Sequence, residues 1–256
     1  MKKGIKIVLS IALLSSLSFG GEQFAMSDAD RAMYAEMLEN NPADIMVESG
    51  AELLEYMGGD AGLAKYLGIS EDELPAYIAG FPRYIKKFDM VVGVDQVLQA
   101  MMHDGGHKPL KLKSGNMFDM ASYVKTIAND EKINIDVNAN PQMKEAYALG
   151  KKVFETKRGG RGLACLSCHS PDIIGGVLRT QPLPDLTSKG VAVAATWPAY
   201  RMTKSSLRTL QRRFQGCMKN ALLAVIPLGS KEMVAMEVYL TQEAKGRAIA
   251  VPGLKR

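Results

Sequence analysis

Apolar residues recur at helical spacing along the first half of the chain, and turn-forming residues separate the runs. We expect helices over residues 27–40, 45–57, 95–102 and 118–128. Ser27 is a candidate N-cap for the first of them. Ser70 and Glu73 have the spacing of a capping box, and Pro75 soon afterwards limits the length of the helix that they open. The pattern predicts a mainly α-helical unit.

The second half of the chain begins and ends with a strong helical pattern. One helix is expected over residues 142–155, with Tyr147, Gly150 and Phe154 close to one face. Because glycine lets two backbones approach closely, Gly150 predicts a contact with a second helix. The expected partner covers residues 231–243. The stretch between the two helices contains several prolines, which predict loops.

Within that stretch, two residues separate Cys165 from Cys168, and His169 follows directly. This C-x-x-C-H spacing is the attachment sequence of c-type haem, in which both thiols bond to one porphyrin and the imidazole binds its iron. The alternatives are a fortuitous spacing, a disulfide hairpin or a thioredoxin-like pair, and the last would be expected within a βαβ pattern that does not surround the motif. The motif occurs once, so we expect one covalent haem c and a redox protein. Helix, motif, irregular stretch and helix follow the order of a class I cytochrome c domain.

Residues 1–20 have the features of a secretory signal peptide. Lys2, Lys3 and Lys6 precede an apolar stretch over residues 7–17, and small residues that offer a cleavage site follow it. The apolar stretch is shorter than the about 20 residues that cross a bilayer, although a retained anchor helix is the alternative. Because c-type haem is attached outside the cytoplasm, signal and motif support each other. We expect a periplasmic protein without a membrane span.

The two parts of the chain that follow the signal peptide carry opposite charge. Residues 21–140 contain 10 basic and 20 acidic residues, whereas residues 141–256 contain 19 basic and 7 acidic residues. This segregation favours two domains, although one fold with two oppositely charged faces is the alternative. Turn-forming residues at 137–141 mark the expected boundary. No cysteine precedes Cys165, so we expect a haem-free domain over 21–140 and a haem c domain over 141–256. The net charge of both together is only +2, and we expect no nucleic-acid partner.

The second axial ligand of the iron decides which function the motif supports. Methionine is typical of an electron-transfer cytochrome, whereas a thiolate would hold the iron at a lower potential. The remaining cysteine, Cys217, follows helical spacing with Leu207, Leu210 and Phe214, so we expect it on the apolar face of a helix. A small buried side chain without reactivity is the alternative reading of Cys217. The methionines available in principle are Met202, Met218, Met233 and Met236.

Arg213 precedes Cys217 by about one helical turn and can reach its sulfur or an anion that approaches it. A nearby guanidinium favours the thiolate, which is both a nucleophile and an iron ligand. The alternative places Arg213 on a solvated basic helix face. Arg208, more than two turns before Cys217, is expected on such a face.

Several stretches of the second half resemble SoxA, the catalytic cytochrome subunit of the SoxAX complex of sulfur oxidation. They are the segments 197–201, 210–218, 229–230, 236–240 and 251–253. The resemblance implies a mainly α fold of two cytochrome c-like domains, of which the second carries the haem here. It also implies that Cys217 is the distal haem ligand and carries an extra sulfur as a persulfide. It further implies that Arg213 binds substrate.

The SoxA family joins thiosulfate oxidatively to a cysteine of the carrier protein SoxYZ and passes two electrons to haem. We therefore expect an L-cysteine S-thiosulfotransferase whose partners are thiosulfate, SoxYZ and a SoxX-type cytochrome subunit. A domain of net charge +12 with an arginine beside a reactive sulfur suits a small dianion. The alternative is a monohaem periplasmic electron-transfer cytochrome c with a methionine ligand, and a haem sensor or interaction module is a third hypothesis. The sequence leaves open whether His103 and His107 bind a metal.

Overall fold

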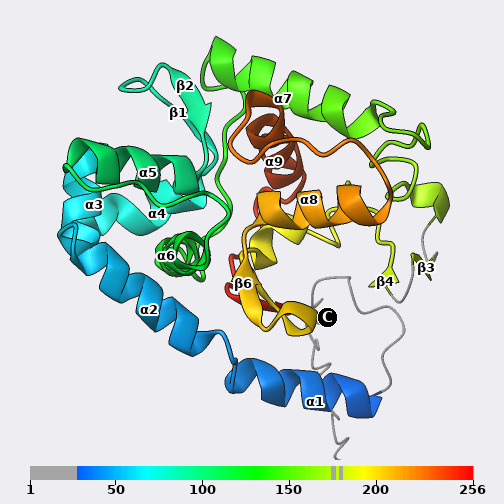
Figure 1. The fold of residues 1–256 in the computed structure, drawn as a ribbon, viewed down its shortest axis with the longest axis horizontal. Helices are drawn as coiled ribbons and strands as arrows, with labels where there is room; N and C mark the ends of the chain where they lie inside the picture. Colours follow the sequence, from blue (N-terminus) through cyan, green and yellow to red (C-terminus); the bar gives the residue numbers. More distant parts are fainter. Residues whose placement is uncertain (1–27, 174–176, 179–180, 256) are drawn as a thin grey trace, which may run out of the picture.

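The structure is a computed structural model and describes residues 28–173, 177–178 and 181–255. The signal peptide predicted over residues 1–20 and the N-cap predicted at Ser27 lie outside the described residues. Helices dominate, with short strands between them (Figure 1), which confirms the expected mainly α fold class. Within the part of the chain that the structure describes, no helix is both long and apolar enough to cross a membrane.

In Figure 1, most of the first half lies on the left, and α1 runs beneath the molecule. Its elements are α1 (Asp28–Glu39), α2 (Asp44–Glu55), α3 (Gly59–Leu67), η1 (Glu71–Glu73), α4 (Leu74–Ala79), β1 (Arg83–Ile85), β2 (Met90–Val92), α5 (Val94–Asp104) and α6 (Gly115–Thr126). Helix α2 packs along α6, because Gly50 leaves room for the carbonyl of Asp119 where a Cβ would collide with it.

The helices predicted in the first half are present, with shifted ends. The helix predicted over 45–57 ends at Glu55, and a left-handed turn at Gly58 (φ 95°) starts α3, which the periodicity did not predict. The capping box is formed, since a Glu73 carboxylate oxygen accepts from the Ser70 amide at 2.9 Å. Pro75 lies in the first turn of the short helix α4, where its missing N–H is not needed.

The second half contains the remaining elements. They are α7 (Pro141–Glu155), η2 (Pro171–Ile173), β3 (Val177–Leu178), β4 (Gln181–Pro182), η3 (Val193–Thr196), β5 (Ala199–Arg201), η4 (Met202–Lys204), β6 (Ser206–Arg208), α8 (Leu210–Asn220), α9 (Lys231–Glu243) and β7 (Gly253–Lys255). Strand β5 lies between β6, which is antiparallel to it, and β7, which is parallel. Helix α7 packs along α9 as predicted: a Cβ on Gly150 would collide with the carbonyl of Ala235 and lie 2.8 Å from the Cβ of Tyr239.

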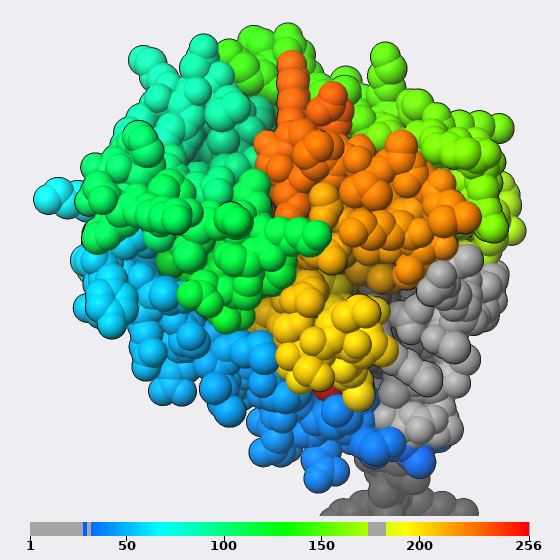
Figure 2. Space-filling model, viewed as in Figure 1, coloured from blue at the N-terminus to red at the C-terminus, as the bar shows by residue number. Residues whose placement is uncertain are grey.

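The two halves share one hydrophobic core. Buried residues of α5 and α6 join those of α7, α8 and α9 in a single cluster, and the halves abut along a continuous surface (Figure 2). Backbone and side-chain bonds cross the contact, among them Gln96 Nε2 to the carbonyl of Gly229 at 3.1 Å. At the predicted boundary, the Asn140 side chain accepts from the Met143 amide at 2.9 Å and so caps α7. The domain limits 21–140 and 141–256 stay a prediction.

Candidate functional site

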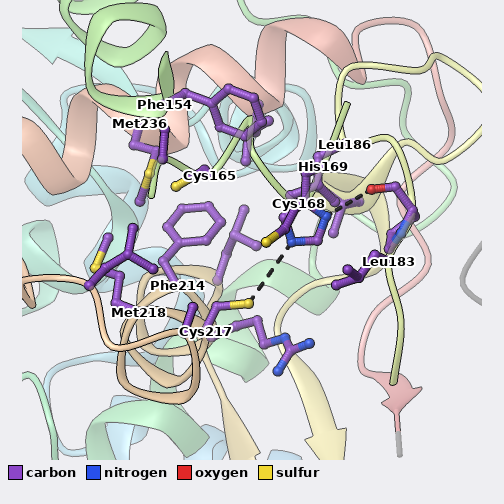
Figure 3. A pocket seen from close by; sticks show the side chains of 18 residues that line it. Phe154, Cys165, Cys168, His169, Leu183, Leu186, Phe214, Cys217, Met218 and Met236 are labelled. Carbon is purple, nitrogen blue, oxygen red and sulfur yellow. Dashed lines mark hydrogen bonds between the residues drawn. The ribbon is translucent and has the colours of Figure 1, made fainter. Parts of the chain in front are cut away.

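The three cysteines and one histidine of the second half meet in one cavity, here called the sulfur cavity (Figure 3). It encloses about 930 Å³ of space between its atoms, part of which is open to solvent. Its polar side chains belong to Cys165, Cys168, His169, Arg213 and Cys217. Its walls are otherwise apolar, from Phe154, Ala164, Leu183, Pro184, Leu186, Val193, Leu210, Phe214, Met218, Ala221, Leu223, Met236 and Leu240.

The segment after α7 forms a tight turn that presents the two cysteines of the motif to the cavity. The amides of Cys168 and His169 both donate to the carbonyl of Cys165, at 3.1 and 3.0 Å. The amide of Leu166 donates to the carbonyl of Phe154 at 3.2 Å and ties the turn to the end of α7. Burial raises the pKa of the Cys165 thiol to about 11 and also raises that of Cys168. Both are neutral thiols at pH 7, and neither forms a disulfide.

His169 is buried, and a hydrogen bond to a backbone carbonyl orients its ring. Its Nδ1 lies 2.8 Å from the backbone carbonyl of Pro184. Because a carbonyl only accepts, Nδ1 carries the proton, and a neutral ring then has its lone pair on Nε2. This is the arrangement by which proteins fix a metal-binding imidazole. Nε2 lies 4.0 Å from the sulfur of Cys217, and Figure 3 shows the two side chains facing each other.

Helix α8 supplies the opposite wall. Thr209 caps it by accepting from the amide of Arg212 at 3.3 Å. Leu210, Phe214 and Cys217 then face the cavity as predicted. Leu207 does not continue this stripe, because it lies in β6.

The thiol of Cys217 differs from the other two thiols. Burial alone would raise its pKa. A hydrogen bond donated by the charged form of His169, together with the charges of Arg213, His169 and Arg201, outweighs burial, so the pKa lies below its ordinary value. Arg213 is partly exposed and lines the cavity. The sulfur that faces His169 is therefore also the sulfur whose thiolate is favoured.

Arg201 is a candidate site residue that the sequence did not single out. It ends β5, and its charge acts on Cys217 although the two residues are 16 positions apart. It is the last residue of the segment 197–201, one of the stretches that carry the family resemblance. That resemblance did not by itself assign a role to Arg201. The position predicted for Arg208, on a solvated helix face, is wrong. Arg208 lies in β6, with its guanidinium carbon 5.1 Å from the centroid of the Phe118 ring.

The four candidate methionines are not equally placed. Met202 is 43% exposed, and Met233 is fully buried without lining the cavity. Met218 and Met236 do line it. The sulfur of Met218 already accepts from the amide of Ile226 at 3.5 Å, within the core. Cys217 is the side chain that faces the free nitrogen of His169, which favours cysteine over methionine as the second ligand.

The residues of the sulfur cavity fit a c-type haem. Cys165 and Cys168 lie one turn apart for the two thioether bonds, and apolar walls suit a porphyrin. The 4.0 Å between His169 Nε2 and Cys217 Sγ is close to the sum of about 2.0 Å and about 2.3 Å, the usual lengths of metal bonds to imidazole and thiolate. Within the described residues, no group of three His, Cys, Asp or Glu side chains is placed to hold a metal ion, and His103 contacts Asp104 at 3.3 Å.

Comparison with known proteins identifies the same part of the chain. Residues 149–249 match the family model described as SoxA/TsdA, cytochrome c domain. The L-cysteine S-thiosulfotransferase subunit SoxA of Hydrogenophilus thermoluteolus is 29% identical over 277 residues, which cover 100% of both chains. The protein of the same description from Hydrogenobacter thermophilus is 29% identical over 218 residues, which cover 84% of this chain and 82% of the relative.

A solved structure shares the fold. A chain from the crystal structure of SoxXA from P. pantotrophus superposes with a TM-score of 0.72 at 19% identity, over 88% of this chain and 84% of that one. The likeness thus extends well beyond residues 149–249 and includes most of the first half.

Proposed function

We propose that this chain, which belongs to the SoxA/TsdA cytochrome c family, is an L-cysteine S-thiosulfotransferase. The reaction joins thiosulfate to a cysteine of the carrier SoxYZ: a carrier thiolate and thiosulfate form one S–S bond, and two electrons leave. The observation that carries the proposal is the position of Cys217, with its sulfur 4.0 Å from His169 Nε2 in a cavity that Arg213 also lines.

Cys165 and Cys168 would hold one haem c covalently, and His169 and Cys217 would bind its iron. When bound, the haem supplies an acceptor for the electrons that sulfur oxidation releases. The carbonyl of Pro184 keeps the His169 ring oriented through Nδ1. Apolar walls such as Phe214 exclude water and strengthen every charged contact within the cavity.

Arg213 and Arg201 would bind the substrate. A guanidinium presents planar donors that can hold two sulfonate oxygens at once, and both charges act on Cys217. They would place the outer sulfur of thiosulfate at the sulfur of Cys217. We propose that Cys217 takes part as a thiolate or persulfide, since its lowered pKa favours the reactive anion.

The proposed partner is a SoxX-type cytochrome subunit, and the proposed location is the periplasm. The solved chain with the same fold comes from a SoxXA structure. Residues 1–20 have the composition of an export signal.

An intact mass of the purified mature chain, with a pyridine haemochrome assay, tests the cofactor. We expect one haem that acid acetone does not extract, and an increment of about 32 Da where Cys217 carries a persulfide. Two haems per chain, or extractable haem, would contradict attachment at Cys165 and Cys168.

A conjugation assay tests the reaction. The chain with its partner cytochrome, thiosulfate and a SoxYZ-type carrier should produce carrier with a thiosulfonate adduct, detected by mass. An electron-transfer cytochrome with a methionine ligand would instead give no adduct, and its ferric spectrum would show the weak far-red band of Met-ligated haem.

A further inference from the structure

A second cavity lies directly behind the sulfur cavity, and Leu210 lines both. Three ionisable side chains from three helices line it: Asp95 of α5, Lys125 of α6 and Glu237 of α9. We call it the carboxylate cavity. It lies where the two halves of the chain meet. No sequence motif indicated that these three residues would lie together.

The charges in the carboxylate cavity do not balance. Two carboxyl groups face one ammonium, so full ionisation would leave one negative charge uncompensated in a poorly solvated place. Asp95 is 5% exposed, and its Oδ1 accepts from the amide of Gln96 at 3.1 Å. Glu237 Oε2 accepts from Gln211 Nε2 at 2.8 Å. These bonds support the carboxylates only in part, and one bound proton would make the cluster neutral.

Desolvation acts on all three groups in the expected directions. It raises the pKa of Asp95 to about 6 and raises that of Glu237, and it lowers the pKa of Lys125. Lys125 and Glu237 retain partial exposure, which gives protons a route from solvent.

The cavity also contains an unpaired donor. Trp197 is 2% exposed, and its Nε1–H has no hydrogen-bond partner. Buried donors in native proteins are satisfied by protein or by ordered water, and the polar residues Thr209 and Thr241 line the same space. The donor set therefore suits water that bridges Trp197 to the acidic side chains.

We propose that Asp95, Lys125 and Glu237, with ordered water, form a proton-binding site that takes up a proton when an electron enters the sulfur cavity. When an external electron donor reduces the bound haem, one carboxylate would bind one proton from solvent, and no other bond would form or break. Leu210 lines both cavities, so added negative charge on one side favours protonation on the other. The inference rests on the proposed haem, and not on the sulfur transfer.

The proposal fixes the sign of a measurable effect. Because reduction is coupled to proton uptake, the reduction potential falls as pH rises. The limit for one proton per electron is about 59 mV per pH unit, a tenfold change in proton activity converted for a one-electron couple.

Potentiometric titration of the full haem-containing chain between pH 5 and 9, with chemical mediators and no thiosulfate, tests it. We expect a sloped potential in the native protein. Glu237→Gln, which can still accept from Gln211, should reduce the slope at least twofold. Glu232→Gln, at an exposed position in the first turn of the same helix, is the matched control and should keep the native slope. Equal slopes in all three proteins, or a native potential independent of pH, would overturn the proposal.

An infrared difference spectrum between the two redox states gives a second readout on the unaltered chain. Reduction should produce the C=O band of a protonated carboxyl group, and Glu237→Gln or Asp95→Asn should remove or shift it. The absence of that band in the native protein would overturn the proposal even where a variant fails to fold. Thiosulfate conjugation with a flat potential would defeat this inference alone, and a sloped potential without conjugation would defeat only the proposed transferase.

Discussion

The sulfur cavity and the carboxylate cavity share a wall but collect opposite chemistry. The first places three thiols and one imidazole among mostly apolar side chains, all from the second half of the chain. The second places two carboxyls, one ammonium and an unpaired indole N–H at the contact between the halves. Soft donors with apolar walls suit a haem and sulfur chemistry, whereas oxygen donors with imbalanced charge suit protons and water. Leu210 of α8 lines both cavities.

Burial acts differently in the two places. In the carboxylate cavity it sets the direction of every pKa shift. In the sulfur cavity it does so for Cys165 but not for Cys217, whose pKa is lowered by His169 and the nearby arginines. Depth alone therefore does not decide reactivity. The charges that face each group do, and changes to single side chains can separate these effects.

The largest expected effect comes from Cys217→Met. A thioether would replace the thiolate, so the reduction potential of the haem should rise by on the order of 0.1 V. The choice of iron ligands changes haem potentials over a range of about 0.8 V. The sulfur nucleophile would be lost as well, and conjugation should fall by at least about three orders of magnitude. Potentiometry and the conjugation assay measure the two outcomes on the same preparation.

Met218→Leu is the matched control, because Met218 lines the same cavity and its sulfur accepts a hydrogen bond from the amide of Ile226. It conserves volume and should leave potential and turnover nearly unchanged. An unchanged Cys217→Met protein, or a Met218→Leu protein with the altered potential, would show that Cys217 is not the ligand.

Arg213→Lys should impair catalysis although it keeps the charge. An ammonium lacks the planar fork that fits two sulfonate oxygens, and losing one charge-assisted contact costs about 1.5 to 3 kcal/mol, or one to two orders of magnitude in kcat/KM for thiosulfate. The haem spectrum should be retained. Arg212→Lys, the adjacent residue that does not line the cavity, should change kcat/KM little. Equal rates for the two lysine variants would make Arg213 part of a diffuse basic surface.

The sequence was most informative where chemistry lies within one segment or one helix. The bounds of α9 were predicted as observed, and α7 differs by one residue, because periodicity, caps and a close-approach glycine agree. Cys165, Cys168 and His169 are held by one turn, and Arg213 and Cys217 by one helix, so their spacing alone indicated their proximity.

Features that depend on strand pairing or on contact between the halves were missed. Leu207 satisfies helical spacing, yet it lies in β6 and packs with Ala43 and Phe118 in a separate cluster. The charge of Arg201 acts on Cys217 only because β5, which ends at Arg201, pairs between β6 and β7. The carboxylate cavity joins residues 95, 125 and 237, and no local pattern links positions so far apart.

A smaller effect, on stability, tests the scaffold of the sulfur cavity. Gly150→Ala would force a methyl group against the carbonyl of Ala235 at the contact of α7 and α9, and should cost about 2 to 3 kcal/mol of unfolding free energy. Gly216→Ala lies inside α8 with open space around the added carbon, and should instead stabilise the protein by about 0.4 to 1 kcal/mol. Urea unfolding of the two variants measures both. Equal effects of the same sign would mean that α7 and α9 do not approach as closely as described.

The last expected effect, smaller than that of Gly150→Ala, is the pH dependence of stability that the carboxylate cavity imposes. The pKa of Asp95 is raised to about 6 by burial, so the folded state binds its proton more tightly than the unfolded chain does. Its stabilising contribution is complete below the ordinary pKa and is lost as pH rises through the folded value.

Lys125, with a lowered pKa, acts with the opposite sign only at higher pH, so the measurement stays below pH 7.5. Between pH 5 and 7.5 the unfolding free energy of the native protein should fall by about 1 to 2 kcal/mol from this source. Asp95→Asn should reduce that fall and leave the part that Glu237, whose pKa burial also raises, contributes with the same sign, whereas Asp72→Asn, at an exposed position, should not change it. Parallel pH profiles for all three proteins in urea titrations would show that Asp95 does not exchange its proton on unfolding, and that the two cavities differ less in their electrostatics than their side chains indicate.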